Sequence, residues 1–106
     1  MKLVIAVVDR DDANAVNEIL SQNGFSSTRL ATTGGFLLAG NVTFLIGVEE
    51  EKVQTVIDLI RERSHSRKKL IPPSVEFGHG YYPGPMEVTV GGATIFVVDV
   101  ERFEHV

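Results

Sequence analysis

Cysteine and tryptophan are both missing from this chain of 106 residues, and aromatic residues make up only 8% of it. Without cysteine there is no disulfide framework, no thiol nucleophile and no thiolate metal site. No apolar run approaches the roughly 20 residues that a membrane span requires, and charges directly follow the first apolar stretch. We therefore expect a cytoplasmic protein with no membrane partner.

Positive charge is scarce as well. The formal net charge is −4 and the sequence pI is about 5.3, whereas a general nucleic-acid binder needs a basic surface to neutralise phosphates. We therefore expect no nucleic-acid partner, although local positive groups would still allow an anionic ligand. With 43% hydrophobic and 23% charged residues, the chain is expected to fold as a single domain over residues 1–106.

Two segments have the pattern of helices. Asp9 to Asp12 supply capping carboxylates, the apolar residues that follow recur on one face, and Asn23-Gly24 gives a stop signal. In residues 49–64, apolar side chains recur at helical spacing, with glutamates at the start and arginines at the end, as the helix dipole favours. Local pattern alone therefore predicts both helices.

Short apolar runs rich in β-branched residues predict strands. These runs are residues 2–8, 25–31, 41–48 and 93–100. Residues 87–90, two glycines and residues 93–100 predict an extra hairpin arm, which follows a long Gly- and Pro-rich loop over residues 64–86. Without that arm the order is strand, helix, strand, strand, helix, strand. This order predicts an α+β protein with a ferredoxin-like βαββαβ sandwich.

The strands at residues 3–8, 43–48 and 95–98 are apolar at both odd and even positions, so both faces of the sheet call for burial. Two helices cover only one face. We therefore expect the other face to pack on a second copy of the chain, in a homo-oligomer. The alternative is that the apolar excess only enlarges the core.

Catalytic signals are weak. His65, His79 and His105 lack the spacing of a metal site and are interpreted as surface residues. The run from Asp9 to Asp12 is interpreted as a helix cap in preference to a magnesium ligand or general base. Residues 61–69 are interpreted as a solvated helix end in preference to a phosphate site. We expect neither an enzyme nor a metal protein.

The ten residues TTGGFLLAGN, at positions 32–41, exceed what a tight hairpin turn needs. Glycines let backbone amides approach an anion, Phe36 offers a flat face for a base, and Asn41 offers an amide that both donates and accepts hydrogen bonds. The residue types fit a nucleotide site, but physical chemistry alone leaves a mobile hairpin tip equally open.

Three stretches of the sequence carry a resemblance to a known family. They are KLVIAVV, TRLATTGGFLLAGNVTFLIGV and EVTVGGATIFVVDV. With them the chain resembles, over nearly its whole length, the cyclic-di-AMP receptor family of PII-like signal transduction proteins. The resemblance implies a ferredoxin-like, PII-like homotrimer that binds cyclic di-AMP in clefts between subunits and needs no other cofactor. It also implies that loops order on binding and signal to an unknown downstream protein.

The resemblance also implies a set of ligand contacts. Thr28 and Asn41 would hydrogen-bond the ligand, and Phe36 and Leu37 would enclose an adenine. The remaining contacts would come from the backbones of Gly35 and Gly47 and from Phe96 of a neighbouring subunit.

The sequence departs from the family pattern just before these contacts. Ser26 stands where family members carry a basic residue, and Gly24 stands where they carry a polar one. Arg29 is not expected to replace the missing cation, because strand alternation points it to the face opposite Thr28. The alternative reading is therefore a PII-like protein that binds another ligand, such as ATP or AMP, or that acts only as a protein-interaction module. The loop over residues 78–85, with Tyr81 and Tyr82, supports that alternative.

Overall fold

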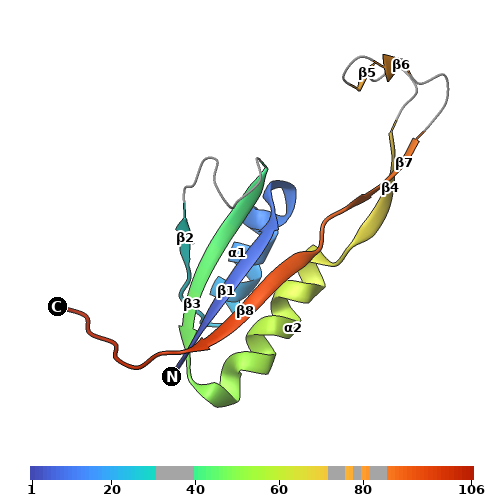
Figure 1. The fold of residues 1–106 in the computed structure, drawn as a ribbon. Helices are drawn as coiled ribbons and strands as arrows, with labels where there is room; N and C mark the ends of the chain where they lie inside the picture. The colour runs from blue at the N-terminus through green and yellow to red at the C-terminus, as the bar shows by residue number, and fades with distance from the viewer. Residues whose placement is uncertain (31–39, 72–75, 78–79, 82–85) are drawn as a thin grey trace.

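The computed structural model describes residues 1–30, 40–71, 76–77, 80–81 and 86–106. Its centre is a four-stranded sheet in the order β2-β3-β1-β8, in which every neighbouring pair is antiparallel (Figure 1). These strands are β1 (Lys2–Asp9), β2 (Thr28–Leu30), β3 (Asn41–Val48) and β8 (Ala93–Asp99). The predicted runs at residues 2–8 and 41–48 are thus confirmed as strands, while β2 is shorter than its predicted run.

Both predicted helices are present in the described ranges. They are α1 (Arg10–Gln22) and α2 (Val53–Ser64), the latter preceded by a 3₁₀ turn, η1 (Glu50–Lys52). Helix α1 begins where expected, because the backbone N–H of Asp11 donates to Asp9 Oδ1 at 2.9 Å. It ends just before Gly24, which adopts a φ of +82°. Neither helix is long and apolar enough to cross a bilayer.

The core lies between the two helices and one face of the sheet. Alternate residues of the central strands are buried on that face, and Phe44 is the largest of the fully buried side chains. The strand residues of the cluster are Val4, Ala6, Val8, Val42, Phe44, Ile46 and Val48, and the helix residues are Ala13, Val16, Leu20, Val56 and Ile60. The period of two along the strands and the helical spacing in α1 and α2 therefore meet in one hydrophobic layer.

A narrow ribbon projects from the sheet (Figure 1). It is formed by β4 (Arg67–Ile71) and β7 (Met86–Val90), which pair antiparallel, and is followed outward by the short pair β5 (Glu76–Phe77) and β6 (Gly80–Tyr81). The ribbon makes the molecule elongated, with extents of 55 × 27 × 19 Å.

Two predictions about this region are wrong. Residues 87–90 and 93–100 do not pair as a hairpin, because β7 pairs with β4 and β8 pairs with β1. The two glycines between them, Gly91 and Gly92, both have positive φ and carry the chain from the ribbon into the sheet instead of reversing it. The predicted loop at residues 64–86 contains β4, whose charged residues gave no apolar signal.

Without the ribbon, the element order is βαββαβ, with the two helices on one side of an antiparallel sheet. This α+β arrangement is compatible with the ferredoxin-like sandwich predicted from the sequence.

Candidate functional site

One face of the sheet is left uncovered by the described elements. Even-numbered residues of β1 lie against the helices, so the odd-numbered residues Leu3, Ile5 and Val7 point to the opposite face. The register carries this open face across the sheet, since Ile5 pairs with Leu45 on one side and with Phe96 on the other. Apolar side chains thus line this face. Figure 1 shows both described helices, α1 and α2, on the other side of the sheet.

Four of the predicted ligand contacts lie on this open face. Thr28 pairs with Leu45 and therefore shares its face. Asn41 and Gly47 are odd-numbered residues of β3, as Leu45 is, and Phe96 pairs with Ile5. Thr28 and Gly47 are exposed, Asn41 is half-buried, and the side chain of Phe96 is 46% exposed. All four residues therefore lie on the same face of the sheet, although they were predicted from the family resemblance and not from their position on a face.

Within one chain these four residues do not form a single cluster. Thr28 and Gly47 are diagonal neighbours on β2 and β3. Phe96 lies in the same cross-strand row as Thr28 but three strand spacings away, about 14 Å. Asn41 lies six residues from Gly47 along β3, about 20 Å. A ligand that touched all four residues would therefore need more than one copy of the chain.

The other three predicted contacts, Gly35, Phe36 and Leu37, lie outside the described residues. The same holds for Tyr82 and for most of the loop segment at residues 78–85 that motivated the alternative reading.

Ser26 is described and exposed, and no cation replaces it on the open face of β2. Arg29 points to the helix side, where its Nη1 donates to Asn14 Oδ1 at 3.1 Å, so the predicted orientation of Arg29 is confirmed.

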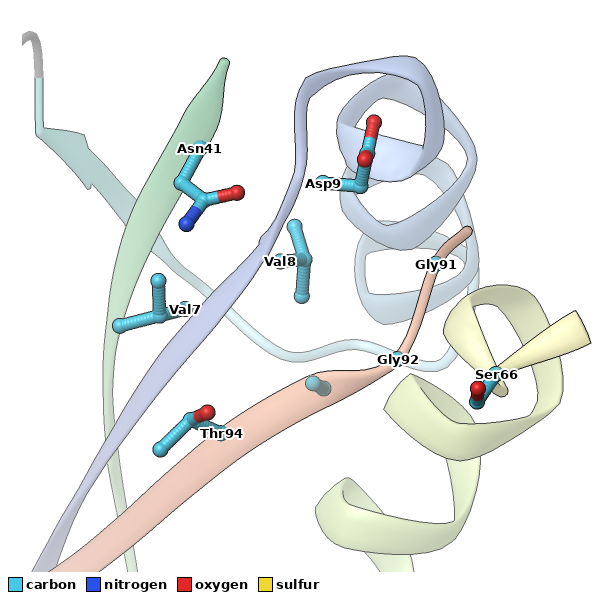
Figure 2. A pocket seen from close by; sticks show the side chains of 9 residues that line it. Val7, Val8, Asp9, Asn41, Ser66, Gly91, Gly92 and Thr94 are labelled. Atoms are coloured by element: carbon cyan, nitrogen blue, oxygen red, sulfur yellow. The ribbon is translucent and has the colours of Figure 1, made fainter. Parts of the chain in front are cut away.

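A cavity of about 330 Å³ lies beside Asn41, at the end of the sheet from which the ribbon leaves (Figure 2). Its polar groups include the Asn41 amide, the Asp9 carboxylate and the Ser66 hydroxyl. Figure 2 shows the Asn41 amide projecting from β3 toward the strand that carries Val8 and Asp9. The full lining is Val7, Val8, Asp9, Asn41, Ser66, Gly91, Gly92, Ala93 and Thr94. The cavity thus joins one predicted ligand contact to the base of the ribbon.

The ribbon base is held to helix α1 by an ion pair. Arg67 Nη2 donates to Asp12 Oδ1 at 2.9 Å, and Arg67 Nη1 lies 3.3 Å from Asp12 Oδ2. The side chain of Asp12 is only 7% exposed, whereas that of Arg67 is 42% exposed. The hydrogen bond that Arg67 donates to Asp12 raises the pKa of Arg67 above its usual range. A buried carboxylate therefore meets a half-exposed guanidinium in fork geometry.

Gly91 closes over this ion pair. A Cβ at Gly91 would lie 2.5 Å from Arg67 Nη1 and 2.9 Å from the backbone oxygen of His65. The next residue, Gly92, donates its backbone N–H to the carbonyl of Ser64 at the end of α2. Sequence reasoning missed this cluster, because Asp12 and Arg67 are 55 residues apart and each had a local explanation.

The sequence expectation for the basic run at residues 61–69 is correct only for its first part. Arg61 and Arg63 do end α2, but Arg67 to Lys69 belong to β4 and are not part of a helix end. His65 caps α2, and His79 lies outside the described residues. Within the described ranges, no group of three His, Asp or Glu side chains is placed to hold a metal ion.

The fold and the open face define a class: α+β proteins that leave one side of an antiparallel sheet free for an interaction. Comparison with known proteins narrows this class. The model of the cyclic-di-AMP receptor family matches residues 1–106, and the chain belongs to that family. Its fold is also similar to a crystal structure of a functionally unknown protein from Pediococcus pentosaceus. That similarity has a TM-score of 0.78 and 42% sequence identity, and it covers 99% of this chain and 96% of the other.

Proposed function

We propose that the protein is a non-catalytic, PII-like receptor for cyclic di-AMP, in which a homotrimer binds the ligand in clefts between subunits and signals to a downstream protein. The observation that carries the proposal is the match of the cyclic-di-AMP receptor family over the whole chain. That family is one of ligand receptors and not of catalysts. The proposal places the protein in the cytoplasm and treats residues 1–106 as one domain.

The open face supports the proposed oligomer. Leu3, Ile5, Val7 and Leu45 are only half-buried there, and the apolar side chains of Phe96 and Val98 are 46% and 43% exposed. Packing this face against another copy would remove apolar area from water at about 25 cal/mol per Å². The radius of gyration is 16.7 Å, against about 13 Å for a compact chain of this length. Much of the chain therefore lies away from its own core, where a neighbour can cover it.

The spread of the predicted contacts supports a site between subunits. Phe96 on β8 and Thr28 on β2 lie at opposite edges of the sheet, so within one copy they are about 14 Å apart. Gly47 adds a second indication. A Cβ at Gly47 would meet no atom within 4 Å, and its φ is not positive. The described packing of the chain itself does not require a glycine there, whereas close approach of a ligand would.

Ser26 favours one alternative, a receptor that has changed its ligand to an adenine mononucleotide or kept only protein contacts. The nearest cation on β2, Arg29, is engaged by Asn14 on the helix side. A phosphate at Thr28 would therefore lack a charge-assisted hydrogen bond from β2, which is worth roughly 1.5–3 kcal/mol.

Isothermal titration calorimetry with cyclic di-AMP, ATP and AMP tests the proposal against this alternative. We expect saturable binding of cyclic di-AMP, at a stoichiometry of one ligand per chain in an oligomer, and weaker binding of the mononucleotides. Heat with ATP or AMP alone would favour the changed receptor. No heat with any of the three at high micromolar concentration would leave only the interaction module. Sedimentation velocity on the same samples measures the oligomeric state independently of the ligand.

A further inference from the structure

A groove lies between α2 and the first half of β8, on the helix side of the sheet. At its upper end it adjoins the cavity beside Asn41, with which it shares Ser66, Gly92 and Ala93. It has a volume of about 430 Å³. Its apolar wall is formed by Ile57 of α2 and by Ala93 and Ile95 of β8, and its rim carries Arg61 and His65. The Arg61 side chain is 67% exposed, and its contact in the described chain is Asp58 at 3.6 Å. The groove is thus an apolar slot with a cation at its edge.

The strand beside this groove has an unpaired edge. β8 is the outermost strand of the sheet, so among the described residues its outer N–H and C=O groups face no other strand. From Ala93 to Val98 it carries no charge, and Val97, on the helix side of the sheet, is 41% exposed. Long apolar edges without charges are ready partners for another extended segment.

The same chain ends in a segment that, among the described residues, pairs with no strand beyond Val100. After β8, residues 100–106 leave the sheet and run away from the body (Figure 1). Phe103 in this segment is 66% exposed. Arg102 Nη2 donates to Glu104 Oε1 at 2.8 Å, which places these two side chains on one side of the segment. In a segment that pairs as a strand, alternation would place Phe103 on the other side together with Glu101.

The segment cannot reach the groove of its own chain. The backbone N–H of Val100 donates to the carbonyl of Met1 at 3.2 Å, which continues the pairing with β1 and directs the chain onward. Val100 is about 17 Å from Ile95 along the strand, and Phe103 is at most about 11 Å of extended chain beyond Val100. Reversal would consume part of that length, so the segment can enter this groove only on another molecule.

We propose that residues 100–106 of a second copy dock in this groove. Phe103 of that copy lies between Ile57 and Ile95, and its backbone pairs with the free edge of β8. Glu101, on the same side as Phe103, lies at the rim beside Arg61. We choose a second copy as the occupant because the segment and the groove of this one sequence are complementary: Phe103 matches the apolar wall and Glu101 matches Arg61. The choice also rests on the homo-oligomer of the proposed function. In a homotrimer each chain would place its segment on the next chain around the ring. The contact is therefore additional to the packing of the open faces.

Because the natural chain has no cysteine, disulfide cross-linking tests this contact directly. The variant Phe103→Cys/Ile57→Cys is oxidised and run on a non-reducing gel. We expect covalent dimers and higher oligomers, at least tenfold more abundant than from either single variant. In the matched control, Arg102→Cys/Ile57→Cys, the thiol at position 102 lies on the opposite side of the segment. We expect no cross-linked oligomer from this variant. A bond within one chain, or a thiol at position 103 that stays free, would overturn the proposal and leave the groove to a different protein.

A second variant separates this contact from the rest of the oligomer. Phe103→Ala is expected to raise the concentration at which the oligomer dissociates at least tenfold in sedimentation experiments, whereas Phe103→Leu keeps most of the apolar contact and changes it less. An unchanged oligomer in Phe103→Ala, without cross-linking in the double variant, refutes the docked segment and leaves the open-face oligomer standing. Absence of cyclic di-AMP binding with full cross-linking refutes the proposed ligand alone. A monomer at every concentration refutes both the docked segment and the oligomer.

Discussion

Arg67 and Asp12 join the projecting ribbon to the first turn of α1, with the closest nitrogen and oxygen 2.9 Å apart. The pair lies beneath Gly91, next to the cavity that contains Asn41. The orientation of the ribbon relative to the sheet therefore depends on a single buried carboxylate and on a glycine with positive φ. Both can be tested by substitutions that leave the hydrophobic core intact.

Asp12→Asn should destabilise the protein. It removes the charge that holds Arg67, and the buried polar group loses a charge-assisted partner, at a cost of about 1–3 kcal/mol. Urea denaturation measures the change in the free energy of unfolding. Asp58→Asn is the matched control, because its contact with Arg61 is exposed and 3.6 Å long, so a change within about 0.5 kcal/mol is expected there. Equal effects of the two substitutions would show that the Asp12 pair has no special role.

Gly91→Ala should cost more than Gly24→Ala. Both glycines have left-handed backbone, with φ of +78° and +82°, so each substitution carries a strain of about 1–2 kcal/mol. Only at Gly91 would the new Cβ also collide with Arg67 and the carbonyl of His65, since Gly24 has no atom within 4 Å of that position. Thermal unfolding of the two variants gives the comparison, and equal losses would contradict the packing described at Gly91.

The stabilising effect of Asp99 should vanish in acid. Lys2 Nζ donates a hydrogen bond to Asp99 Oδ1, which lowers the pKa of Asp99 below its ordinary value of 3.8. The carboxyl binds its proton less readily in the folded chain than in the unfolded one. Its contribution to the free energy of unfolding is therefore complete above pH 3.8 and is lost as the pH falls through the lowered pKa. The Tm of Asp99→Asn should therefore lie below that of the natural chain at pH 7, and the difference should close in strong acid. A difference that persists there would point to a role of Asp99 other than charge.

Asn41→Ala should weaken cyclic di-AMP binding while leaving the oligomer intact. The amide lines the cavity at the end of β3, and losing one of its hydrogen bonds to a charged or polar ligand group corresponds to roughly a tenfold loss of affinity. Calorimetry and sedimentation of the same variant separate the two effects. Gln54→Ala, on the exposed side of α2, is the control and should bind as the natural chain does. Unchanged affinity in Asn41→Ala would remove Asn41 from the site.

Ser26→Lys should strengthen cyclic di-AMP binding if the ligand's phosphate lies near Thr28. The added charge-assisted hydrogen bond is worth roughly 1.5–3 kcal/mol, which is a ten- to hundredfold gain in affinity. Ser27→Lys places the same charge on the helix side, where the Ser27 hydroxyl now meets Asn17 at 3.3 Å, and should give no gain. If the two variants bind alike, the gain reflects net charge and not a local phosphate contact.

The elements predicted from the sequence are those whose signal is local. Asp9 and Gly24 bound α1 by capping and backbone freedom, and the apolar run of β3 gave both of its ends. Strand β4 was missed because a ribbon strand exposed on both sides needs no apolar alternation, and Arg67 to Lys69 resemble a solvated helix end. The hairpin prediction failed at Gly91 and Gly92, since two glycines allow a tight turn and a passage from the ribbon into the sheet equally well.

The candidate site was harder to foresee, for a different reason. The period of two along a strand fixed that Thr28 and Arg29 would point to opposite faces. It could not show that Phe96 would share the face of Thr28, because that depends on the register of β8 against β1. The pairing of Asp12 with Arg67 is set by tertiary packing over 55 residues, for which a single sequence contains no pattern.

Strand β1 lies between β3 and β8, and this position bears on the order in which the chain folds. Its pairing with β3 closes a modest loop, whereas its pairing with β8 joins residues 97 positions apart, as the Lys2 contact with Asp99 shows. Contacts so distant in sequence form late and slowly. On a ribosome, β1 would therefore keep an unprotected edge until β8 emerges, and any nascent chain that stops short of β8 would expose the most apolar strand of the sheet to aggregation.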